Sequence, residues 1–447
     1  ILQFANTQDF ETARKTIFTT PKERKLESVF NVIEKPLIPV IKKMDDTGVL
    51  VDVSYLKKLS KEYHKELSGF EKRIYKYAGT TFNIKSPKQL AEILFDKLEL
   101  KPINQKKTAT GQRSTKESEL EKMRDEHPII EAIFNYRELQ KLLSTYIDAL
   151  PKLVADDGRL HAEFLQAGAA TGRMASQNPG LQNIPIRTEH GRRIRNAFIS
   201  EQGFSIVALD YSQIELRIAA IISGDKKLIK VFKEGGDVHT AVASDVFGVE
   251  KEKVNKEMRR KAKVINFGIL YGMGVNALRT NLGGETTTKE ARAFYDAYFN
   301  TYNGLAQWID HTKADAARLG YTETLFGRRR YFEGINSKLP FVRAAAERMA
   351  INAPVQGTSA DVIKIAMVRV DDHIQKEGLS NDVRLVLQVH DELVYEIRTT
   401  LVKKVAPEIE KIMEEVLPLK QTKSVPLSVD VMVGTNWGEM KSLGSRE

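Results

Sequence analysis

The stretch Val383-Arg-Leu-Val-Leu-Gln-Val-His-Asp-Glu-Leu-Val-Tyr-Glu-Ile397 predicts a β-hairpin, because runs rich in valine and leucine lie on both sides of a short polar centre. Asp391 and Glu392 occupy the predicted turn. Aspartate and glutamate are poor residues for strand interiors, whereas at a tight turn their side chains are free to project and to bind metal. The hairpin therefore predicts both a piece of antiparallel sheet and a candidate metal-binding position.

A second stretch, Phe204-Ser-Ile-Val-Ala-Leu-Asp210, is an apolar run of strand length that ends in a carboxylate. The next residues, Tyr211-Ser-Gln-Ile-Glu-Leu-Arg217, change to helical spacing, so Asp210 is expected where a strand ends and a helix begins. If Asp210 and Asp391 meet, they can hold two magnesium ions ~3.5–4 Å apart, one activating an attacking hydroxyl and the other stabilising a leaving phosphate. A single turn aspartate is more often ordinary, so the flanking residues have to decide.

The composition is that of a large globular protein with a basic surplus. The 447 residues are too many for one compact core, and 42% hydrophobic with 29% charged residues excludes a disordered chain. A formal net charge of +10 suits a polyanionic partner, either nucleic acid or an acidic membrane. The absence of cysteine excludes disulfides, thiolate zinc sites and cysteine nucleophiles. Any metal must then have oxygen or imidazole ligands, and oxygen ligands favour magnesium or manganese. No uninterrupted apolar run approaches the ~20 residues that a membrane span requires.

The residues around the two aspartates carry a resemblance to a known family. Asp210-Tyr-Ser-Gln-Ile-Glu-Leu-Arg217 and Gln388-Val-His-Asp-Glu-Leu-Val394 resemble the first and third polymerase motifs of family A DNA polymerases, which include bacterial DNA polymerase I. The resemblance runs from about residue 36 to Trp437. It implies a template-directed DNA polymerase that extends a DNA primer 3′ end with deoxynucleoside triphosphates and uses two Mg²⁺ ions, for which Mn²⁺ can substitute. The implied catalytic residues are Asp210, Asp391 and Glu392, and the implied metal ligands are Asp210, Tyr211 and Asp391.

A helical stretch, Glu257-Met-Arg-Arg-Lys-Ala-Lys-Val-Ile-Asn-Phe-Gly-Ile-Leu-Tyr-Gly272, supplies a candidate nucleotide-binding face. Four residues of this stretch are spaced four apart: Arg259, Lys263, Phe267 and Tyr271. They lie along one face of the helix, and the line that joins them turns slowly around the helix axis because one turn has about 3.6 residues. Two cations suit the phosphates of a nucleoside triphosphate, and Phe267 suits its sugar and base. The alternative is an amphipathic helix with solvated cations and core aromatics, and the family resemblance favours the nucleotide.

The resemblance adds roles for three residues beside the nucleotide. His239, in Asp237-Val-His-Thr, is implied as a further phosphate contact, and Tyr271 as the residue stacked at the templating position. Glu215 is implied beside the sugar, where its side chain leaves no room for a ribose 2′-hydroxyl.

The resemblance also implies contacts with a primer–template duplex, which a polymerase must grip whatever its sequence. The degenerate acceptor pattern of the minor groove suits this task. Arg173, in Thr171-Gly-Arg-Met, and Gln356, in Pro354-Val-Gln-Gly, resemble the minor-groove sensors of the family, and His390 is expected near the primer terminus. Further implied backbone or base contacts are Gln182, Asn183 and Arg187. Two arginine clusters suit phosphates, with a solvated surface as the alternative: Gly327-Arg-Arg-Arg330, which includes Arg328, and Arg192, Arg193 and Arg195.

The fold class that the resemblance implies is α+β, a right-hand polymerase fold with an antiparallel palm sheet, a helical thumb and helical fingers. Residues 1–35 are expected to be the edge of an upstream exonuclease-like domain and are too few for a nuclease fold, so no proofreading activity of the chain's own is expected. The basic stretch from Asn104 to Lys116 predicts a flexible tip of the thumb. The other expected boundaries are palm at 36–53, thumb at 54–150, palm at 151–219, fingers at 220–340 and palm at 341–447.

Three other functions compete with this interpretation. A single-subunit RNA polymerase shares the hand-like fold, but that class lacks the glutamate at 215 and typically has tyrosine where this chain has Phe267. An inactive DNA-binding or scaffold protein would not need Asp210, Asp391 and the cations of the helix together, and a two-metal nuclease would not need the triphosphate helix. Reverse transcription as a side activity stays open. The expected partners are primer–template DNA and deoxynucleoside triphosphates, with no membrane, for a monomer in the cytoplasm of bacterial or phage origin, with an organellar origin left open.

Overall fold

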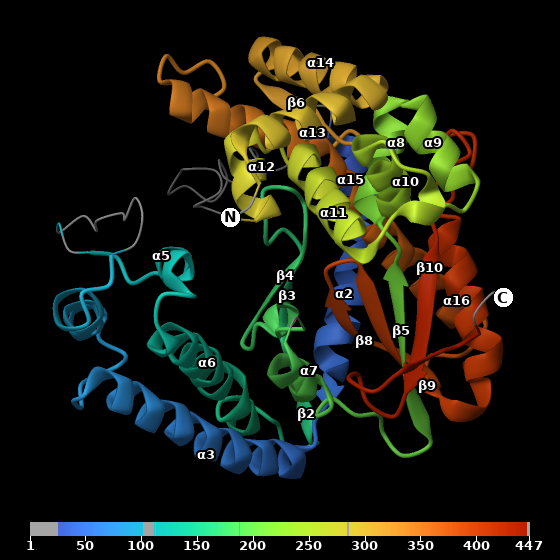
Figure 1. Cartoon of the computed structure of the whole chain (residues 1–447). Coiled ribbons are helices and arrows are strands. Elements are labelled where there is room, and N and C mark those ends of the chain that lie inside the picture. Colours follow the sequence, from blue (N-terminus) through green and yellow to red (C-terminus); the bar gives the residue numbers. More distant parts are fainter. Residues whose placement is uncertain (1–25, 102–110, 112, 187, 284–285, 445–447) are drawn as a thin grey trace, which may run out of the picture.

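The computed structural model describes residues 26–101, 111, 113–186, 188–283 and 286–444. Figure 1 shows three groups of elements, of which the first is a twisted sheet with covering helices at the right. The second, called the arm here, contains α3 (Val53–Ala78) and α6 (Pro128–Leu142) at the lower left. The third, called the upper helices, runs from α8 (Ile214–Ser223) to α14 (Asn303–Leu319).

The central sheet is antiparallel and has the strand order β11-β10-β5-β9-β8. Its strands are β5 (Phe204–Tyr211), β8 (Val383–Val389), β9 (Glu392–Arg398), β10 (Val429–Gly434) and β11 (Lys441–Ser442). The run from Phe204 to Leu209 is buried throughout, as expected for a central strand with both faces covered. The strand predicted over 204–210 is thus confirmed, and so is the predicted α+β fold with an antiparallel sheet.

The predicted hairpin of β8 and β9 is also confirmed, but its turn is shorter than the sequence suggested. Val389 pairs with Glu392, so only His390 and Asp391 form the loop, and His390 takes the left-handed conformation with φ +54°. The prediction that Glu392 lies in the turn is wrong. Glu392 is the first residue of β9, because pairing with Asp210 on β5 extends the strand to this position.

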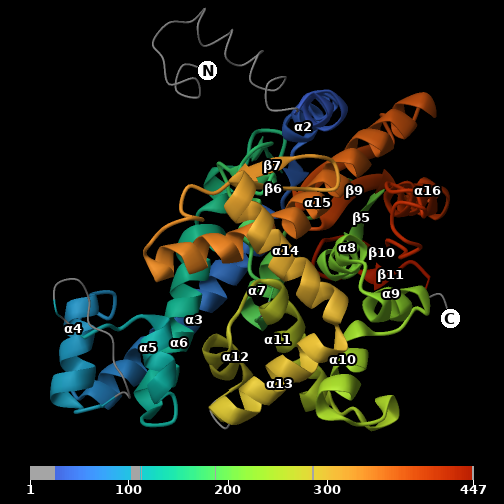
Figure 2. The same cartoon turned by 90° about the horizontal axis from the view of Figure 1, so that it is seen from above.

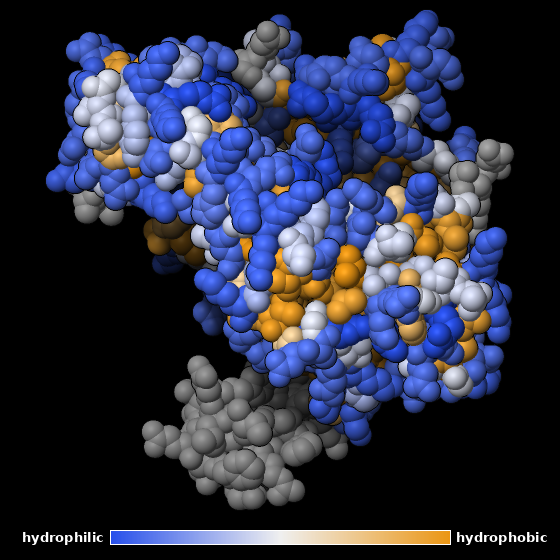
Figure 3. All heavy atoms as spheres, turned by 90° about the horizontal axis from the view of Figure 1, so that it is seen from below, coloured by the Kyte–Doolittle hydropathy of each residue, from blue (hydrophilic) through white to orange (hydrophobic). Residues whose placement is uncertain are grey.

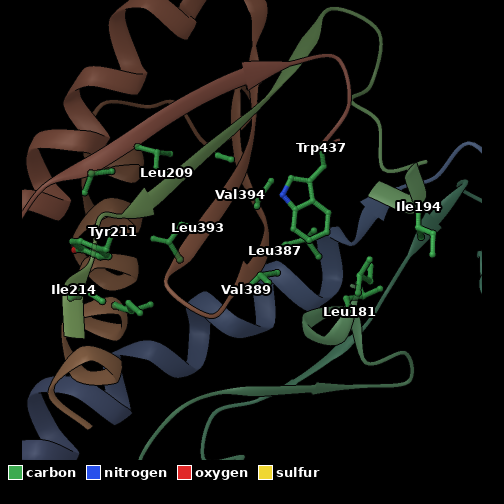
Figure 4. Packing of buried hydrophobic residues seen from close by; sticks show 14 of the residues in the cluster. Leu181, Ile194, Leu209, Tyr211, Ile214, Leu387, Val389, Leu393, Val394 and Trp437 are labelled. Atoms are coloured by element: carbon green, nitrogen blue, oxygen red, sulfur yellow. The ribbon is translucent and has the colours of Figure 1, made fainter. Parts of the chain in front are cut away.

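Two helices pack against the sheet, α2 (Lys35–Thr47) and α16 (Val402–Glu414), and the 37-residue α15 (Pro340–Lys376) packs against both of them. The long α15 runs from the upper helices into the region of the sheet (Figures 1 and 2). Buried apolar side chains of β5, β8 and β9 meet Trp437 in the core between these layers (Figure 4). The strand ends that carry Asp210 and Asp391 therefore stand on a tightly packed base.

The upper helices are held together by a buried carboxylate. Asp225 is 2% exposed and accepts backbone hydrogen bonds from Lys227 and Leu228 at the start of one helix and from Gly304 and Leu305 at the start of another. A carboxylate at the N-terminal ends of two helices satisfies amides that lack intrahelical partners. The helices between α8 and α14 are α9 (Lys226–Lys233), α10 (Val238–Phe247), α11 (Lys256–Leu270), α12 (Val275–Leu282) and α13 (Thr288–Thr301).

The arm is a pair of packed helices with short helices at its far end. The first, α3, begins where the Asp52 carboxylate accepts the Tyr55 amide at 2.8 Å, and it packs on α6. The short helices are α4 (Pro87–Ala91) and α5 (Glu117–Leu120). Of the predicted tip, residues 104–110 and 112 lie outside the described residues, as do residues 1–25 of the expected upstream edge. Val29–Glu34 form a π-helical turn that leads into α2.

The remaining elements connect these groups. They are α7 (Glu189–Arg195) and the strand pairs β1 (Val49–Leu50) with β2 (Arg159–Leu160), β3 (Glu163–Leu165) with β4 (Ala175–Gln177), and β6 (Tyr321–Glu323) with β7 (Arg329–Tyr331). The face seen from below is mostly hydrophilic, with apolar side chains gathered near its middle (Figure 3). Among the helices of the described ranges, none is both long and apolar enough to cross a membrane.

Candidate active site

The two aspartates that the sequence singled out meet at the end of the central strands. Asp210 is the penultimate residue of β5, and the Tyr211 amide donates to the backbone oxygen of Asp391 at 3.2 Å. The Ser359 hydroxyl of α15 donates to Asp391 Oδ1, also at 3.2 Å. Two segments that are far apart in the sequence are thus fixed to each other by their backbones, with α15 supporting one carboxylate.

A row of three acidic residues crosses the sheet at this point. Asp210 pairs in register with Glu392 of β9 on one side and with Asp430 of β10 on the other. Side chains directly opposite one another in an antiparallel sheet project from the same face. Burial raises the pKa of Asp210 to about 7, the charges of Glu392, Asp391 and Asp430 act in the same direction, and Arg195 opposes them. Burial also raises the pKa of Asp391 and of Glu392.

This concentration of carboxylates suits a divalent cation. Among the described residues, no group of three or more His, Cys, Asp and Glu side chains forms a ready-made metal cage. Magnesium does not need one, since it keeps several waters and is commonly bound by one or two carboxylates together with substrate phosphates. Asp210, Asp391 and the nearby Tyr211 backbone carbonyl are therefore a chemically adequate donor set.

Glu392 points to partners of its own. Trp437 Nε1 donates to Glu392 Oε1 at 3.2 Å, and Arg195 Nη1 lies 3.7 Å from Oε2. The Arg195 guanidinium also covers the Trp437 ring, 3.7 Å from its centroid, and the Trp437 amide donates to the Phe198 carbonyl at 2.9 Å. The segment around Trp437 is thus held next to Glu392, one end of the acidic row.

The predicted arginine cluster at 192–195 is divided by the structure. Arg195 faces Glu392 and Trp437, whereas Arg193 makes two hydrogen bonds to Glu62 of α3 at 2.6 and 2.7 Å. Successive helical residues point in different directions, so a run of arginines in the sequence does not make one basic surface.

The candidate nucleotide-binding helix is α11, and it packs against α10. Arg259 Nε donates to Asp237 Oδ2 at 2.6 Å, while Lys263 is exposed. Phe267 is half-buried between Tyr271, whose ring stacks on it with centroids 6.1 Å apart, and His239, at 5.7 Å. The spacing of four residues thus keeps Arg259, Lys263 and Phe267 at accessible positions on the helix.

Glu215, Tyr271 and Arg173 form one hydrogen-bonded group. The Tyr271 hydroxyl donates to Glu215 Oε2, and Arg173 donates to Glu215 Oε1. Burial raises the pKa of Glu215, and Arg173 and the Tyr271 hydroxyl oppose this rise. Burial and the neighbouring Glu215 raise the pKa of Tyr271. The group links the first turn of α8, the end of α11 and the turn that carries Arg173.

Several predicted duplex contacts surround one pocket, which Arg173, Gln182, Gln388 and His390 help to line. Gln182 Nε2 donates to the Gln388 backbone oxygen at 3.0 Å and to its side-chain oxygen at 2.7 Å. Gln388 Nε2 in turn donates to the His390 carbonyl at 2.6 Å. Burial lowers the pKa of His390, and Arg173 and Arg195 act in the same direction, so its imidazole is neutral near pH 7.

The other predicted duplex contacts are less closely grouped. Gln356 is half-buried on α15, and the Asn183 backbone oxygen accepts from the Tyr146 hydroxyl at 2.6 Å. Arg187 lies outside the described residues. Arg328 points inward and forms ion pairs with Asp361, at 2.7 Å, and with Glu34.

Arg328 belongs to a buried charge cluster that sequence reasoning missed. Lys364 is 1% exposed and donates to Glu34 Oε1 at 2.8 Å, and Asp361 is fully buried. Arg328 also packs against Gly172, at which φ is +86° and an added Cβ would come within 2.8 Å of the arginine side chain. Buried charges require partners of this kind. The sequence signal was available only in part, as charged residues at core positions of α15.

Asp430 and Trp437 were missed as well. Asp430 stands in an alternating strand, Val429-Asp-Val, where an acidic side chain on one face is unremarkable until the strand order is known. Trp437 is 1% exposed, and a single buried tryptophan is usually a core residue. Pairing between distant strands brings both residues to the site.

Comparisons with known proteins identify the family of the chain. Residues 53–439 match the model of the family described as DNA polymerase family A. The chain is 48% identical over 427 residues to a "DNA polymerase I, thermostable" of Thermus thermophilus, and the match covers 94% of this chain and 50% of that protein. It is also 48% identical over 416 residues to the protein of the same name from Thermus aquaticus, covering 93% of this chain and 49% of that one. The chain thus spans about half the length of these curated relatives.

A solved structure gives the same result for the fold. The POL domain of Pol1 from M. smegmatis, in complex with DNA primer-template and dNTP, superposes with a TM-score of 0.87 at 38% identity. The match covers 94% of this chain and 72% of that one. The predicted right-hand polymerase fold is therefore confirmed, and the chain belongs to DNA polymerase family A.

Proposed function

We propose that this chain is a DNA-directed DNA polymerase that extends the 3′ end of a primer with deoxynucleoside triphosphates in the order set by a template. The observation that carries the proposal is the junction of Asp210 and Asp391 through the Tyr211 amide. The charge of Asp391 also contributes to the raised pKa of both Glu215 and Tyr271, which supports placing the carboxylate pair and the end of α11 in one site. Family membership and a neighbour solved with primer-template and dNTP support the same activity.

In this proposal Asp210, Asp391 and the Tyr211 carbonyl hold two magnesium ions, with manganese as a substitute. Bound ions of this kind activate the attacking hydroxyl and stabilise the charge of the leaving phosphate. The two carboxylates and the carbonyl would supply the oxygen ligands for these ions. Glu392, engaged by Trp437 and Arg195, adds negative charge beside Asp210.

The nucleotide is placed along the exposed face of α11. Arg259, Lys263 and His239 bind its phosphates, and Phe267 contacts its sugar. Asp237, which accepts from Arg259, keeps that guanidinium in place before the substrate arrives. Tyr271 stacks at the templating position, and its hydrogen bond holds Glu215 beside the sugar, where a 2′-hydroxyl would collide.

The duplex is read through its minor groove by Arg173 and Gln356, with His390 near the primer end. Gln182 and its bonded partner Gln388 hold the turn that carries His390, and Asn183 and Arg187 complete the proposed set of direct DNA contacts. The inward ion pairs of Arg328 support an indirect part, in which it fixes the Gly172 turn before Arg173. We also propose a cytoplasmic location, on the basis of bacterial relatives, and keep the expectation of a monomer as part of the proposal.

The test is primer extension by the purified chain, with deoxynucleotides and ribonucleotides supplied separately on a DNA template. We expect template-ordered extension with deoxynucleotides, and its loss in Asp210→Ala and Asp391→Ala, with DNA binding kept within a few-fold. Asp156→Ala, at an exposed aspartate of an ordinary turn, is the matched control and should remain active.

Each competing function has its own outcome in this assay. Equal use of ribonucleotides would indicate an RNA polymerase, and binding without extension would indicate a scaffold. Shortening of the primer in place of extension would indicate a nuclease. Extension at a tenth of the parent rate in either aspartate variant would contradict the two-metal assignment.

A further inference from the structure

A buried amide lies against the candidate phosphate ligand His239. Asn266 is fully buried on α11, and its Nδ2 is 3.0 Å from His239 Nδ1 in the first turn of α10, where His239 is 3% exposed. The other polar atom of the amide, Asn266 Oδ1, is also buried and has no hydrogen-bond partner. A buried amide oxygen without a hydrogen-bond partner lowers the stability of the fold. The presence of asparagine at this position is therefore not explained by stability, and its hydrogen bond to the imidazole suggests a functional role.

The surroundings of His239 favour a neutral ring. Burial lowers the pKa of His239 to about 4, and the cations of Arg259 and Lys263 act in the same direction, whereas Asp237 opposes them. Asp237 is itself engaged, since it accepts from the Arg259 guanidinium, the Thr240 hydroxyl and the His239 amide. The Phe267 ring closes another side, 5.7 Å from the imidazole. At pH 7 the ring therefore carries one proton and one lone pair.

Which nitrogen carries that proton is decided by the partner of Nδ1. An amide NH₂ is a donor only, so a hydrogen bond from Asn266 Nδ2 requires the lone pair to be on Nδ1 and leaves the proton on Nε2. A donor at Nε2 attracts a phosphate oxygen, whereas a lone pair there would repel it.

We propose that Asn266 is a positioning residue that fixes His239 in the Nε2–H tautomer, so that the ring donates a hydrogen bond to an oxygen of the incoming triphosphate. The inference rests on the proposed function, in which His239 contacts the phosphates. Its first consequence, the tautomer, exists in the protein without any nucleotide.

The tautomer is measured by NMR on the 447-residue protein labelled with ¹⁵N-histidine, at pH 8 and without nucleotide. The chain has eight histidines, and His239→Gln identifies the signals of interest by their loss. We expect a non-protonated Nδ1 and a protonated Nε2 for His239. Protonation at Nδ1 would overturn the proposal whether or not the chain polymerises DNA. Absence of primer extension with the expected tautomer would instead remove only the proposed function.

Asn266→Asp tests the consequence for the substrate. A carboxylate accepts from Nδ1–H, so the variant should reverse the tautomer, and KM for the deoxynucleotide at pH 8 should rise roughly tenfold, as for the loss of one hydrogen bond to a charged group. The new carboxylate also raises the pKa of His239. At pH 6 the ring should then be protonated on both nitrogens, and KM should return towards the parent value.

This pH dependence separates a positioning role from a structural one. A purely structural defect would raise KM equally at pH 6 and pH 8, and that result would contradict the proposal. His239→Gln and the double variant with Asn266→Asp should have the same KM, because Asn266 acts only through the ring. Asn303→Asp, at an exposed residue in the first turn of α14, is the matched control and should leave KM unchanged at both pH values. If Asn266→Asp does not fold, the parent tautomer alone still decides.

Discussion

The chemistry of the Asp210 side chain depends strongly on its neighbours. It lies between Glu392 and Asp430 in the register of the sheet, and its pKa is raised to about 7 by burial and by these charges. A carboxylate in this environment is poorly tolerated in its charged form unless a cation is present. In the proposed function a divalent cation would offset this cost, and without the cation the charged carboxylate lowers the stability of the fold.

Asp210→Asn should stabilise the metal-free protein at pH 8, and to a clearly smaller extent at pH 5. The folded-state pKa is above the ordinary value of 3.8, so the unfolded chain loses this proton first, and the folded state loses stability as the pH rises from about 4 to about 7. Asparagine is uncharged and removes this penalty. In the presence of a chelator, the melting temperature of the variant should exceed that of the parent by a few degrees at pH 8 and by clearly less at pH 5. An equal difference in melting temperature at both pH values would show that the pKa of Asp210 is not raised in the folded protein. Asp156→Asn is the control and should change the melting temperature at neither pH.

Phe267→Tyr should relax discrimination against dideoxynucleotides. Phe267 is half-buried on the accessible face of α11. A dideoxynucleotide lacks the 3′-hydroxyl, and the phenol hydroxyl of a tyrosine at this position would supply a polar group near the 3′ carbon in its place. Such a hydrogen bond is worth roughly 1–3 kcal/mol, so the incorporation ratio should change about tenfold or more. The measurement is competitive incorporation of each dideoxynucleotide against its natural counterpart.

The matched control for this change is Phe294→Tyr on α13, which adds the same hydroxyl to another half-buried phenylalanine. It should leave the incorporation ratio alone. If Phe267→Tyr also leaves it alone, Phe267 does not face the sugar, and the placement of the nucleotide along α11 is wrong.

Among the elements, the segment around Trp437 connects the end of the chain to the acidic row. Its indole donates to Glu392 and carries the Arg195 guanidinium on its face. Trp437→Phe keeps an aromatic ring for Arg195 but removes the donor, so it should lower kcat roughly tenfold while KM for the nucleotide stays within about twofold. Trp308→Phe on α14 is the same substitution at the other tryptophan of the chain and should have no such effect. Unchanged kcat in Trp437→Phe would mean that the indole only fills space.

The elements predicted from the sequence are those with strong local patterns. The apolar run before Asp210 and the hairpin around Asp391 form as expected, because strand composition and turn residues are local properties. Three features could not be predicted in this way. Glu392 lies in a strand and not in the turn, Asp430 lies beside Asp210, and the Arg328 side chain points inward. They depend on which strands pair and which helix covers them, and that information is spread over the whole chain.

For the chain as a whole, the net charge of +10 predicts how its affinity for DNA depends on salt. Binding that releases counterions from phosphates weakens linearly on a logarithmic scale, with a slope of about −0.9 for each phosphate neutralised. If the chain contacts several phosphates along a duplex, raising the salt concentration from low to moderate should therefore lower the affinity at least about tenfold. Fluorescence anisotropy with a labelled primer–template, measured over a series of salt concentrations, gives the slope.

The slope also tests where the duplex lies. Lys106 and Lys107 belong to the basic stretch predicted as the tip of the arm, whereas Lys403 and Lys404 are exposed on α16, a helix that packs on the sheet. Replacing either pair by glutamine removes two charges, so any effect of net charge alone is equal in the two variants. If the arm grips the duplex, only the Lys106 and Lys107 variant should reduce the slope, by roughly 2 units. Equal slopes in both variants would mean that the helical arm does not hold DNA, and the proposed path of the duplex across the molecule would have to be redrawn.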